Sequence, residues 1–337
     1  MIQTKYNSEY QAIIDATRLS GLSDDKNFLS VYESSNAQIF PYQIMAARFT
    51  LRSDYLKGCI LCDEASLGKT YEALLVVCQK WFEGNENILI ILPANLLTQW
   101  FRKLEKDFPT VPYVFGNNTK TIPDETGLVI TSYDNAIRYA ERIKERDWDI
   151  VVFDEADVLS KSENKSVQIL KEMAGHAFKL LLTPTPITKS IMDIYWLIWF
   201  IDESVFPDSD WFYKRYFRRP DNYHELTNWV SQFCFRTLKC QTTDYVNFTR
   251  RIPITINYQL SKEEKDLYKL VSAYIISDDK VAKGLDLEFC PVIVNYDLPY
   301  DSIKIEQRIC RCHRQGQNSD VLVINMLSRE NFADVRI

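Results

Sequence analysis

The sequence predicts an α/β fold built on a parallel β-sheet, and three observations support this prediction. Short apolar runs recur along the chain, and longer segments of helical periodicity lie between them. Continuous apolar strands separated by helices are typical of parallel sheets that helices cover on both faces. Polar motifs follow directly after several of the apolar runs, where ligand sites form in sheets of this kind.

The size and composition of the chain are compatible with two globular domains. It has 337 residues, of which 46% are hydrophobic and 13% aromatic, and its mean hydropathy is −0.24. These values indicate a well-packed soluble protein. The formal net charge is −6 and the pI about 5.3, so bulk charge does not predict a polyanionic partner. A nucleic acid would have to bind at a local basic groove.

The sequence has no segment typical of a membrane span or a secretory signal. The longest apolar run, at residues 191–201, is interrupted by Asp193 and is too short to cross a bilayer. No positively charged start precedes an apolar stretch. We therefore expect a cytoplasmic protein without a membrane partner, whose eight cysteines remain thiols.

Residues 1–35 are predicted to form a helical extension, because apolar side chains from Tyr10 to Leu19 fall close to helical spacing. Residues 36–202 carry the regular alternation of strands and helices and are expected to form the first lobe. Its strands are predicted at residues 59–62, 88–92, 128–131, 150–153 and 180–183. Its helices include residues 70–82 and 96–107.

Residues 203–251 interrupt this alternation and are predicted to connect two lobes. Residues 211–219 combine aromatic and basic side chains, which indicates either a DNA-facing element or a packed structural brace. Residues 252–337 are expected to form an abbreviated second lobe. Its strands are predicted at residues 254–260, 292–296 and 321–325, and its helices at 261–273 and about 302–312.

The run from Asp63 to Thr70 follows a predicted strand and opens a predicted helix. It ends in Gly-Lys-Thr, the phosphate-binding signature, although the upstream glycine of the general pattern is absent. A helix amino terminus offers free N–H groups and a positive dipole end to phosphate oxygens. Lys69 would reach the β and γ phosphates and Thr70 would bind Mg²⁺. The alternative is a turn that matches the signature by chance. The predicted nucleotide-binding residues of this loop are Ser66, Leu67, Gly68, Lys69 and Thr70.

Another predicted strand, at residues 150–153, ends in the acidic pair Asp154 and Glu155. Carboxylates at the end of a buried strand are costly unless a cation or catalysis requires them. Asp154 is the expected Mg²⁺ partner, and Glu155 would polarise an attacking water molecule. The alternative is a solvated strand end.

A third strand is followed by Thr183-Pro184-Thr185-Pro186. The two hydroxyl groups beside the acidic pair would relay the state of the γ-phosphate. The alternative is an ordinary proline-rich turn.

The run at residues 307–317 is basic and lies far from the phosphate loop in the sequence. Arg311 and Arg314 are three positions apart, so they would share one helical face and enter a nucleotide cleft together. Arginines of this kind stabilise the charge that develops during phosphoryl transfer. The alternative is a solvated basic helix.

Two cysteine groups are candidate metal sites but are expected to be inert. Cys59 and Cys62 are three positions apart in a strand, so their side chains point to opposite faces. Cys310, Cys312 and His313 have no second ligand pair at zinc-finger spacing.

These segments, in this order, resemble the Swi/Snf-type ATPases of helicase superfamily two. The phosphate loop, the acidic motif and the Thr-Pro motif match in register, and the basic run at residues 307–317 is the most diagnostic. Gln43, after Phe40-Pro41-Tyr42, resembles the adenine-reading element. Residues 91–100 and 131–133 resemble motifs that lie along the DNA backbone. Gly284 and Asp286 belong to a segment that resembles the fifth motif and are expected to contribute to nucleotide binding.

The resemblance covers roughly residues 36 to 330. It implies two RecA-like lobes, of which the first is the P-loop NTPase lobe. It also implies ATP and Mg²⁺ in the cleft and translocation along double-stranded DNA, through backbone contacts that do not depend on base sequence.

Three departures from the family pattern stand out. Ser66 replaces a usual glycine, and Pro184 replaces a usual glycine or alanine. The third departure is larger, because the predicted helix at residues 261–273 is followed almost at once by Ser277-Asp278-Asp279. The fourth motif and several strand–helix units of the second lobe are missing. An internal deletion, an incomplete gene product and a reduced variant all remain open.

The sequence therefore predicts an ATP hydrolase of the DNA-translocase type. The first alternative is a remnant that binds ATP or DNA but whose shortened second lobe impairs hydrolysis. A P-loop kinase or metabolic ATPase is disfavoured by the arginine-rich run and by the lack of a small-substrate motif.

Overall fold

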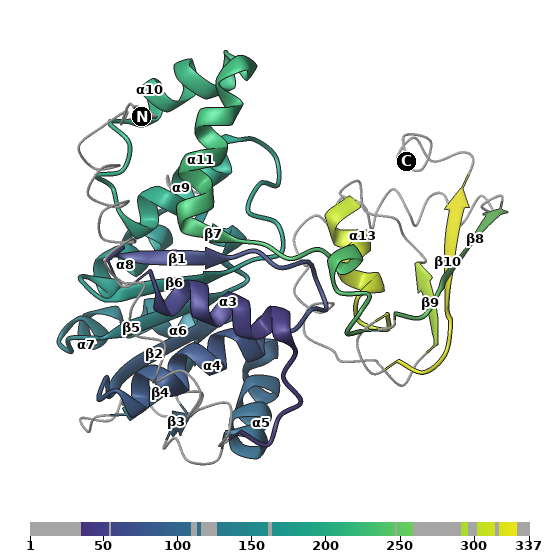
Figure 1. Ribbon diagram of the computed structural model, residues 1–337, viewed down its shortest axis with the longest axis horizontal. Coiled ribbons are helices and arrows are strands. Elements are labelled where there is room, and N and C mark those ends of the chain that lie inside the picture. The colour runs from purple at the N-terminus through teal and green to yellow at the C-terminus, as the bar shows by residue number, and fades with distance from the viewer. Residues whose placement is uncertain are drawn as a thin grey trace, which may run out of the picture. The chain divides into compact units, whose positions relative to one another are not determined.

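The computed structural model describes residues 35–53, 55–108, 113–115, 127–160, 164–246, 248–258, 291–295, 302–313 and 317–328. The chain divides into two compact units (Figure 1). The first runs to Glu64 and from Gly68 to Leu238, and the second comprises Ala65–Leu67 and the chain from Lys239 onward. Nearly all of the predicted extension at residues 1–35, and the predicted helix at 261–273, lie outside the described residues.

The first unit contains a sheet of seven strands in the order β3-β4-β2-β5-β6-β1-β7, and every pairing is parallel. Its strands are β1 (Gly58–Leu61), β2 (Asn87–Leu92), β3 (Tyr113–Phe115), β4 (Gly127–Ser132), β5 (Ile150–Asp154), β6 (Phe178–Leu182) and β7 (Cys234–Phe235). The α/β prediction is confirmed, and all five strands predicted for the first lobe are present within two residues of the expected ends.

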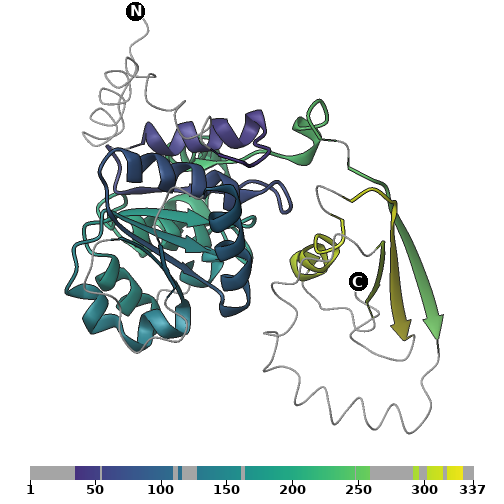
Figure 2. The ribbon, with the colours of Figure 1, turned by 90° about the horizontal axis from the view of Figure 1, so that it is seen from below.

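Helices cover both faces of this sheet (Figure 2). The α-helices of the first unit are α3 (Pro41–Leu51), α4 (Lys69–Phe82), α5 (Leu97–Asp107), α6 (Tyr133–Arg138), α7 (Ala140–Lys144), α8 (Lys165–Ala174), α9 (Met192–Ile201), α10 (Ser209–Phe212) and α11 (Tyr223–Phe233). Its shorter helical turns are η2 (Ala94–Leu96), η3 (Ala156–Ser160), η4 (Tyr213–Phe217) and η5 (Pro220–Asn222).

Two apolar cores, one on each face, hold the sheet and the helices together. Side chains of α3, α4 and α5 form one core, and those of α6 to α11 form the other. Neighbouring strand residues alternate between the cores, as Cys59 and Cys62 do. The two thiols therefore lie on opposite faces, as the sequence predicted. Because both faces of each strand are buried, the strands are continuous apolar runs.

The aromatic part of the predicted connecting segment packs into the first unit. The rings of Phe206 and Phe212 lie 5.0 Å apart, and those of Phe212 and Tyr216 lie 4.9 Å apart. Both Phe212 and Tyr216 are fully buried. The chain then forms α11 and β7 and adds the seventh strand beside β1. The first unit therefore extends to Leu238, beyond the predicted boundary at residue 202, because this segment buries an apolar face.

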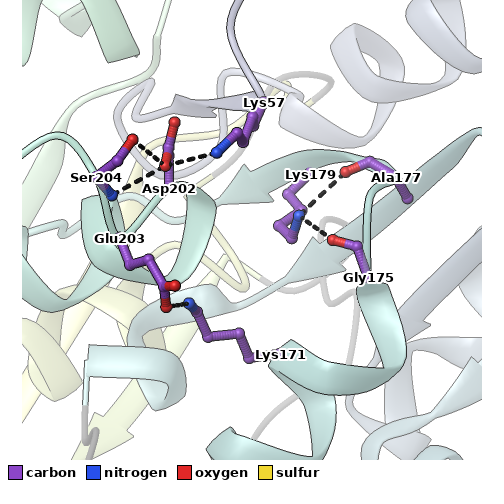
Figure 3. Close-up of polar contacts among 8 residues, drawn as sticks. All are labelled: Lys57, Lys171, Gly175, Ala177, Lys179, Asp202, Glu203 and Ser204. Atoms are coloured by element: carbon purple, nitrogen blue, oxygen red, sulfur yellow. Dashed lines mark hydrogen bonds and ion pairs between the residues drawn. The ribbon is translucent and has the colours of Figure 1, made fainter.

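A lysine is buried near the amino ends of the strands, at the edge of the sheet where β6 begins (Figure 3). Lys179 is 3% exposed, and its Nζ donates to the carbonyl oxygens of Gly175 at 2.8 Å and Ala177 at 3.2 Å. Burial and two nearby lysines lower the pKa of Lys179 to about 8. Gly58 lies against the same residue, since a Cβ there would be 2.2 Å from the carbonyl oxygen of Lys179.

The second unit contains a parallel sheet of three strands in the order β8-β10-β9. Its elements are η6 (Lys239–Gln241), β8 (Arg251–Tyr258), β9 (Val292–Asn295), α13 (Ser302–Ile309) and β10 (Val321–Ser328). One face packs on α13 through Val321 and Val323. On the opposite face, Ile252, Ile254, Val292 and Val294 are between 41% and 55% exposed. The three predicted strands are present, but α13 ends three residues before the expected end at 312.

None of the helices in the described part of the chain is both long and apolar enough to span a membrane.

Candidate functional site

The predicted motifs of the first unit meet at one edge of its sheet. The phosphate loop follows β1, the acidic pair closes and follows β5, and the Thr-Pro motif follows β6. These three strands are adjacent in the order β5-β6-β1 and run parallel, so their carboxyl ends lie side by side. In open α/β sheets, this edge is where ligands bind.

The phosphate loop ends at the amino terminus of α4. Gly68 caps the helix with a φ of 93°, a left-handed conformation that glycine adopts without strain. Ser66 also has a positive φ, of 76°, where the family has glycine. The ammonium group of Lys69 donates to the carbonyl oxygen of Asp63 at 2.7 Å, which holds the lysine over its own loop. The first amides of α4 are those that a helix leaves available to an anion.

Gln43 lies beside this loop. Its Oε1 accepts a hydrogen bond from the amide of Phe40 at 3.0 Å, and the residue is 1% exposed. A Cβ added at Gly68 would lie 2.4 Å from Nε2 of Gln43. The structure therefore brings the predicted adenine-reading residue into contact with the predicted phosphate loop.

Two acids that the sequence did not assign to the site lie beneath the loop. Asp63 and Glu72 are fully buried, and burial raises the pKa of both carboxyl groups, that of Glu72 well above its ordinary value. Asp63 Oδ1 accepts from the amide of Thr237 at 2.7 Å. The nearby Asp63 carboxyl group adds to the effect of burial on Glu72, and both carboxylate oxygens of Glu72 are buried without a hydrogen-bond partner among the described residues.

Asp154, the predicted Mg²⁺ ligand, is held at several atoms. Its Oδ1 accepts from the amide of Glu155 at 2.9 Å, and its Oδ2 accepts from the indole Nε1 of Trp100 at 2.8 Å. Its carbonyl oxygen accepts from the Tyr133 hydroxyl at 2.9 Å. Burial and the neighbouring Glu155 carboxylate raise the pKa of Asp154 to about 6, while Lys69 opposes the shift.

Glu155 has a φ of 52°, and its Oε2 is buried without a hydrogen-bond partner among the described residues. An orphaned carboxylate oxygen beside the half-buried Asp154 carboxylate fits a site that receives a cation and a polar substrate. Mg²⁺ is usually held by one or two carboxylates together with substrate phosphates. The donor set of Thr70 and Asp154 fits that description.

The Thr-Pro motif is tied to the phosphate loop by a residue that the sequence analysis missed. Arg236 Nη1 donates to the carbonyl oxygens of Cys62 at 3.0 Å and Pro184 at 2.9 Å. Thr183 is fully buried and its Oγ1 accepts from the amide of Thr185 at 3.2 Å. No sequence signal pointed to Arg236, since it stands far from both motifs along the chain.

The remaining predicted site residues belong to the second unit. Arg311 lies in the turn that directly follows the end of α13 at Ile309, where the amide of His313 still donates to the carbonyl oxygen of Ile309 at 2.9 Å. The predicted helical face that it would share with Arg314 stays a prediction. Arg314, Gly284 and Asp286 lie outside the described residues.

The histidine beside the second cysteine group has both ring nitrogens engaged. His313 Nδ1 accepts from Arg251 Nε at 3.1 Å, and its Nε2 lies 2.6 Å from the carbonyl oxygen of Thr249. Burial lowers the pKa of His313, which favours the neutral ring. Within the described ranges, no group of three or more His, Cys, Asp and Glu side chains is arranged to hold a metal ion.

Known proteins with similar sequences include two that are named as helicases. A chromodomain-helicase-DNA-binding protein 1-like of Danio rerio is 28% identical over 250 residues, which cover 68% of this chain and 24% of that protein. The helicase YqhH of Bacillus subtilis is 28% identical over an alignment of 427 positions. The alignment covers 87% of this chain and 76% of that protein. The chain thus spans only about a quarter of the first relative's length.

A solved structure has the same fold. The Sulfolobus solfataricus SWI2/SNF2 ATPase core in complex with dsDNA superposes with a TM-score of 0.59 and 16% sequence identity, over 88% of this chain and 89% of that one.

The family profile of the SNF2-related domain matches residues 42–314, which include the phosphate loop, the acidic pair, the Thr-Pro motif and the first part of the basic run, up to Arg314. The match extends over most of the sequence and includes residues of both units. This chain therefore belongs to the SNF2-related family, and its first unit is a RecA-like lobe of the kind found in the SWI2/SNF2 ATPase core.

Proposed function

We propose that this protein hydrolyses ATP and couples the hydrolysis to movement along double-stranded DNA. One observation carries the proposal: a glycine-capped phosphate loop and a half-buried acidic pair lie at the carboxyl edge of one parallel sheet in a chain of the SNF2-related family. The relative YqhH, which is named as an ATP-dependent helicase, supports the use of ATP.

The chemical work is divided among Gln43, the phosphate loop and the acidic pair. Gln43 contacts the adenine, and the amides of residues 66–70 hold the phosphates together with Lys69. Thr70 and Asp154 hold Mg²⁺, which when bound neutralises phosphate charge. Glu155 accepts a hydrogen bond from the attacking water and orients it toward the γ-phosphate.

Residues of the second unit are proposed to complete the reaction. Arg311 and Arg314 stabilise the negative charge that develops on the transferred phosphoryl group. Gly284 and Asp286 belong to the nucleotide-binding set. These roles follow from the family motifs, and each can be tested by substituting the residue.

Double-stranded DNA is the proposed track. The support is the family and the related ATPase core, which was solved in complex with dsDNA. Contacts to phosphates are electrostatic and do not distinguish between bases. We therefore expect DNA binding that is independent of base sequence and weakens steeply with salt.

A second candidate is a remnant that binds ATP or DNA without efficient hydrolysis. The exposed face of Ile252, Ile254, Val292 and Val294 in the second unit favours it, because parallel sheets are normally covered on both faces. The alignment with YqhH also contains more positions than this chain has residues, so part of that relative has no counterpart here.

Steady-state ATP hydrolysis of the purified chain, with and without double-stranded DNA, distinguishes the two candidates. Glu155→Gln is the control, since it preserves shape and removes the carboxylate. Turnover that rises with DNA and is lost in the control would establish the DNA-dependent ATPase. ATP binding with no DNA-stimulated turnover would overturn it and favour the remnant.

A further inference from the structure

Trp100 is a buried residue whose one polar atom points at the acidic pair. It lies on α5, in the connection that follows β2, and is fully buried in the core shared by α3, α4 and α5. Strand β2 pairs with β5, with Ile91 opposite Phe153, so this connection starts beside the end of β5. The indole Nε1 donates to Asp154 Oδ2 at 2.8 Å.

This hydrogen bond fixes a carboxylate that already has one other donor. The amide of Glu155 reaches Oδ1 at 2.9 Å, so each oxygen of Asp154 accepts one bond from a neutral donor. Both bonds orient the carboxylate without cancelling its charge. Each oxygen keeps a free lone-pair direction, because a carboxylate offers about four acceptor sites.

The chemistry of indole makes the arrangement directional. Its N–H is a donor only, so it cannot bind a cation or accept a proton from a neighbour. A buried indole also has few rotamers available in a close-packed core. The position of Oδ2 is therefore set by the packing of α5 on the sheet.

We propose that Trp100 is a positioning residue that orients the Asp154 carboxylate for the Mg²⁺–nucleotide complex. The proposal rests on the proposed function, since it concerns the same site. Side chains that hydrogen-bond a metal ligand commonly change metal affinity by about 10-fold to 100-fold when they are removed. If Trp100 only fills the core, replacing it should lower the stability of the protein and leave the metal affinity unchanged.

Trp100→Phe tests this, because it removes the N–H donor and keeps an aromatic ring. The matched control is Trp148→Phe. Trp148 is also buried, and its Nε1 donates to the carbonyl oxygen of Ile143 at 2.9 Å, away from the acidic pair. Both variants lose one ring and one hydrogen bond, so their losses of thermal stability should be similar.

The direct readout is Mn²⁺ binding to the full chain in the presence of ADP, followed by electron paramagnetic resonance. The second readout is the Mg²⁺ concentration that half-saturates ATP hydrolysis. We expect Trp100→Phe to raise both constants by about 10-fold or more. Trp148→Phe should stay within about twofold of the wild-type chain.

The assignment would be overturned if Trp100→Phe bound Mn²⁺ with wild-type affinity, or if Mn²⁺ affinity fell equally in the two variants. The outcome is separable from that of the proposed function. Wild-type chain that binds Mn²⁺ and ADP but does not hydrolyse ATP refutes the ATPase, and the variants still decide the role of Trp100. A wild-type chain that binds no Mn²⁺ with ADP refutes both.

Discussion

The backbone amide of Thr237 donates a hydrogen bond of 2.7 Å to the buried carboxylate of Asp63, across 174 residues of sequence. Asp63 begins the phosphate loop, and Thr237 follows the last strand of the sheet. The amide of Glu64 in turn donates to the carbonyl oxygen of Thr237 at 3.0 Å. The loop that is predicted to hold phosphate is therefore anchored by a segment far along the chain.

Two substitutions of Asp63 should separate the contribution of its hydrogen bond to the free energy of unfolding from the contribution of its buried charge. Asp63→Leu leaves the Thr237 amide without its acceptor, and we expect the free energy of unfolding to fall by about 1–3 kcal/mol. Asp63→Asn keeps an acceptor oxygen and removes a buried acid, so it should match or exceed wild-type stability. Urea denaturation measures both. Equal losses in the two variants would contradict the anchoring role.

Gly68 is predicted to tolerate no side chain. In Gly68→Ala the methyl group would meet Nε2 of Gln43 and the residue would be held at a φ of 93°. Gly84→Ala is the matched control, because Gly84 has a φ of 95° with no atom within 4 Å of an added Cβ. Each variant carries a backbone cost of about 1–2 kcal/mol.

Only Gly68→Ala should also weaken binding of a fluorescent ATP analogue, by about 10-fold or more, since about 1.4 kcal/mol corresponds to tenfold. Thermal denaturation reports the shared backbone cost. A Gly68→Ala variant that binds the analogue like the Gly84→Ala variant would show that Gln43 yields to the methyl group.

Arg236 is expected to couple the phosphate loop to the Thr-Pro motif. One nitrogen donates to carbonyl oxygens on both segments, at Cys62 and Pro184. Arg236→Gln shortens the donor and removes its charge, at a cost of about 1.5–3 kcal/mol for a charged hydrogen bond. We expect kcat for ATP hydrolysis to fall by about 10-fold or more, with a smaller change in KM. Arg236→Lys, which keeps the charge, should recover part of the rate. A change confined to KM would contradict the coupling.

The burial of Lys179 leads us to expect that the free energy of unfolding rises with pH. Its pKa in the folded protein is about 8, below the ordinary value of 10.5. Between these values the unfolded chain binds more protons, so the free energy of unfolding increases as pH rises through this window. The increase is at most about 3 kcal/mol. Below about pH 8 the lysine is charged in both states and the cost of burying it is present in full.

Lys179→Met should flatten this dependence, as measured by urea denaturation between pH 7.5 and about 10. Lys57→Met is the comparison, because the Lys57 side chain lies on the same edge and is 58% exposed. It should largely keep the wild-type slope. A slope that survives in Lys179→Met would mean that another group titrates.

The sequence by itself was sufficient for the local features of this protein. Strands buried on both faces, such as β1 and β2, appear as unbroken apolar runs, and the Gly-Lys-Thr end of the phosphate loop has its own signature. Parallel strands place their following residues at one edge, so the proximity of Lys69 to the acidic pair also followed from the sequence. These features depend on periodicity and on neighbouring residues.

The tertiary structure decided the contacts between segments that are distant in sequence. Trp100 donates to Asp154 and Arg236 to Pro184, and neither pairing is encoded by spacing or residue type. The aromatic segment around Phe212 reads equally well as a surface or as a core, and only packing placed it inside the first unit. The physical reason is that a hydrogen bond or a buried ring depends on which surfaces meet, and that is settled by the whole fold.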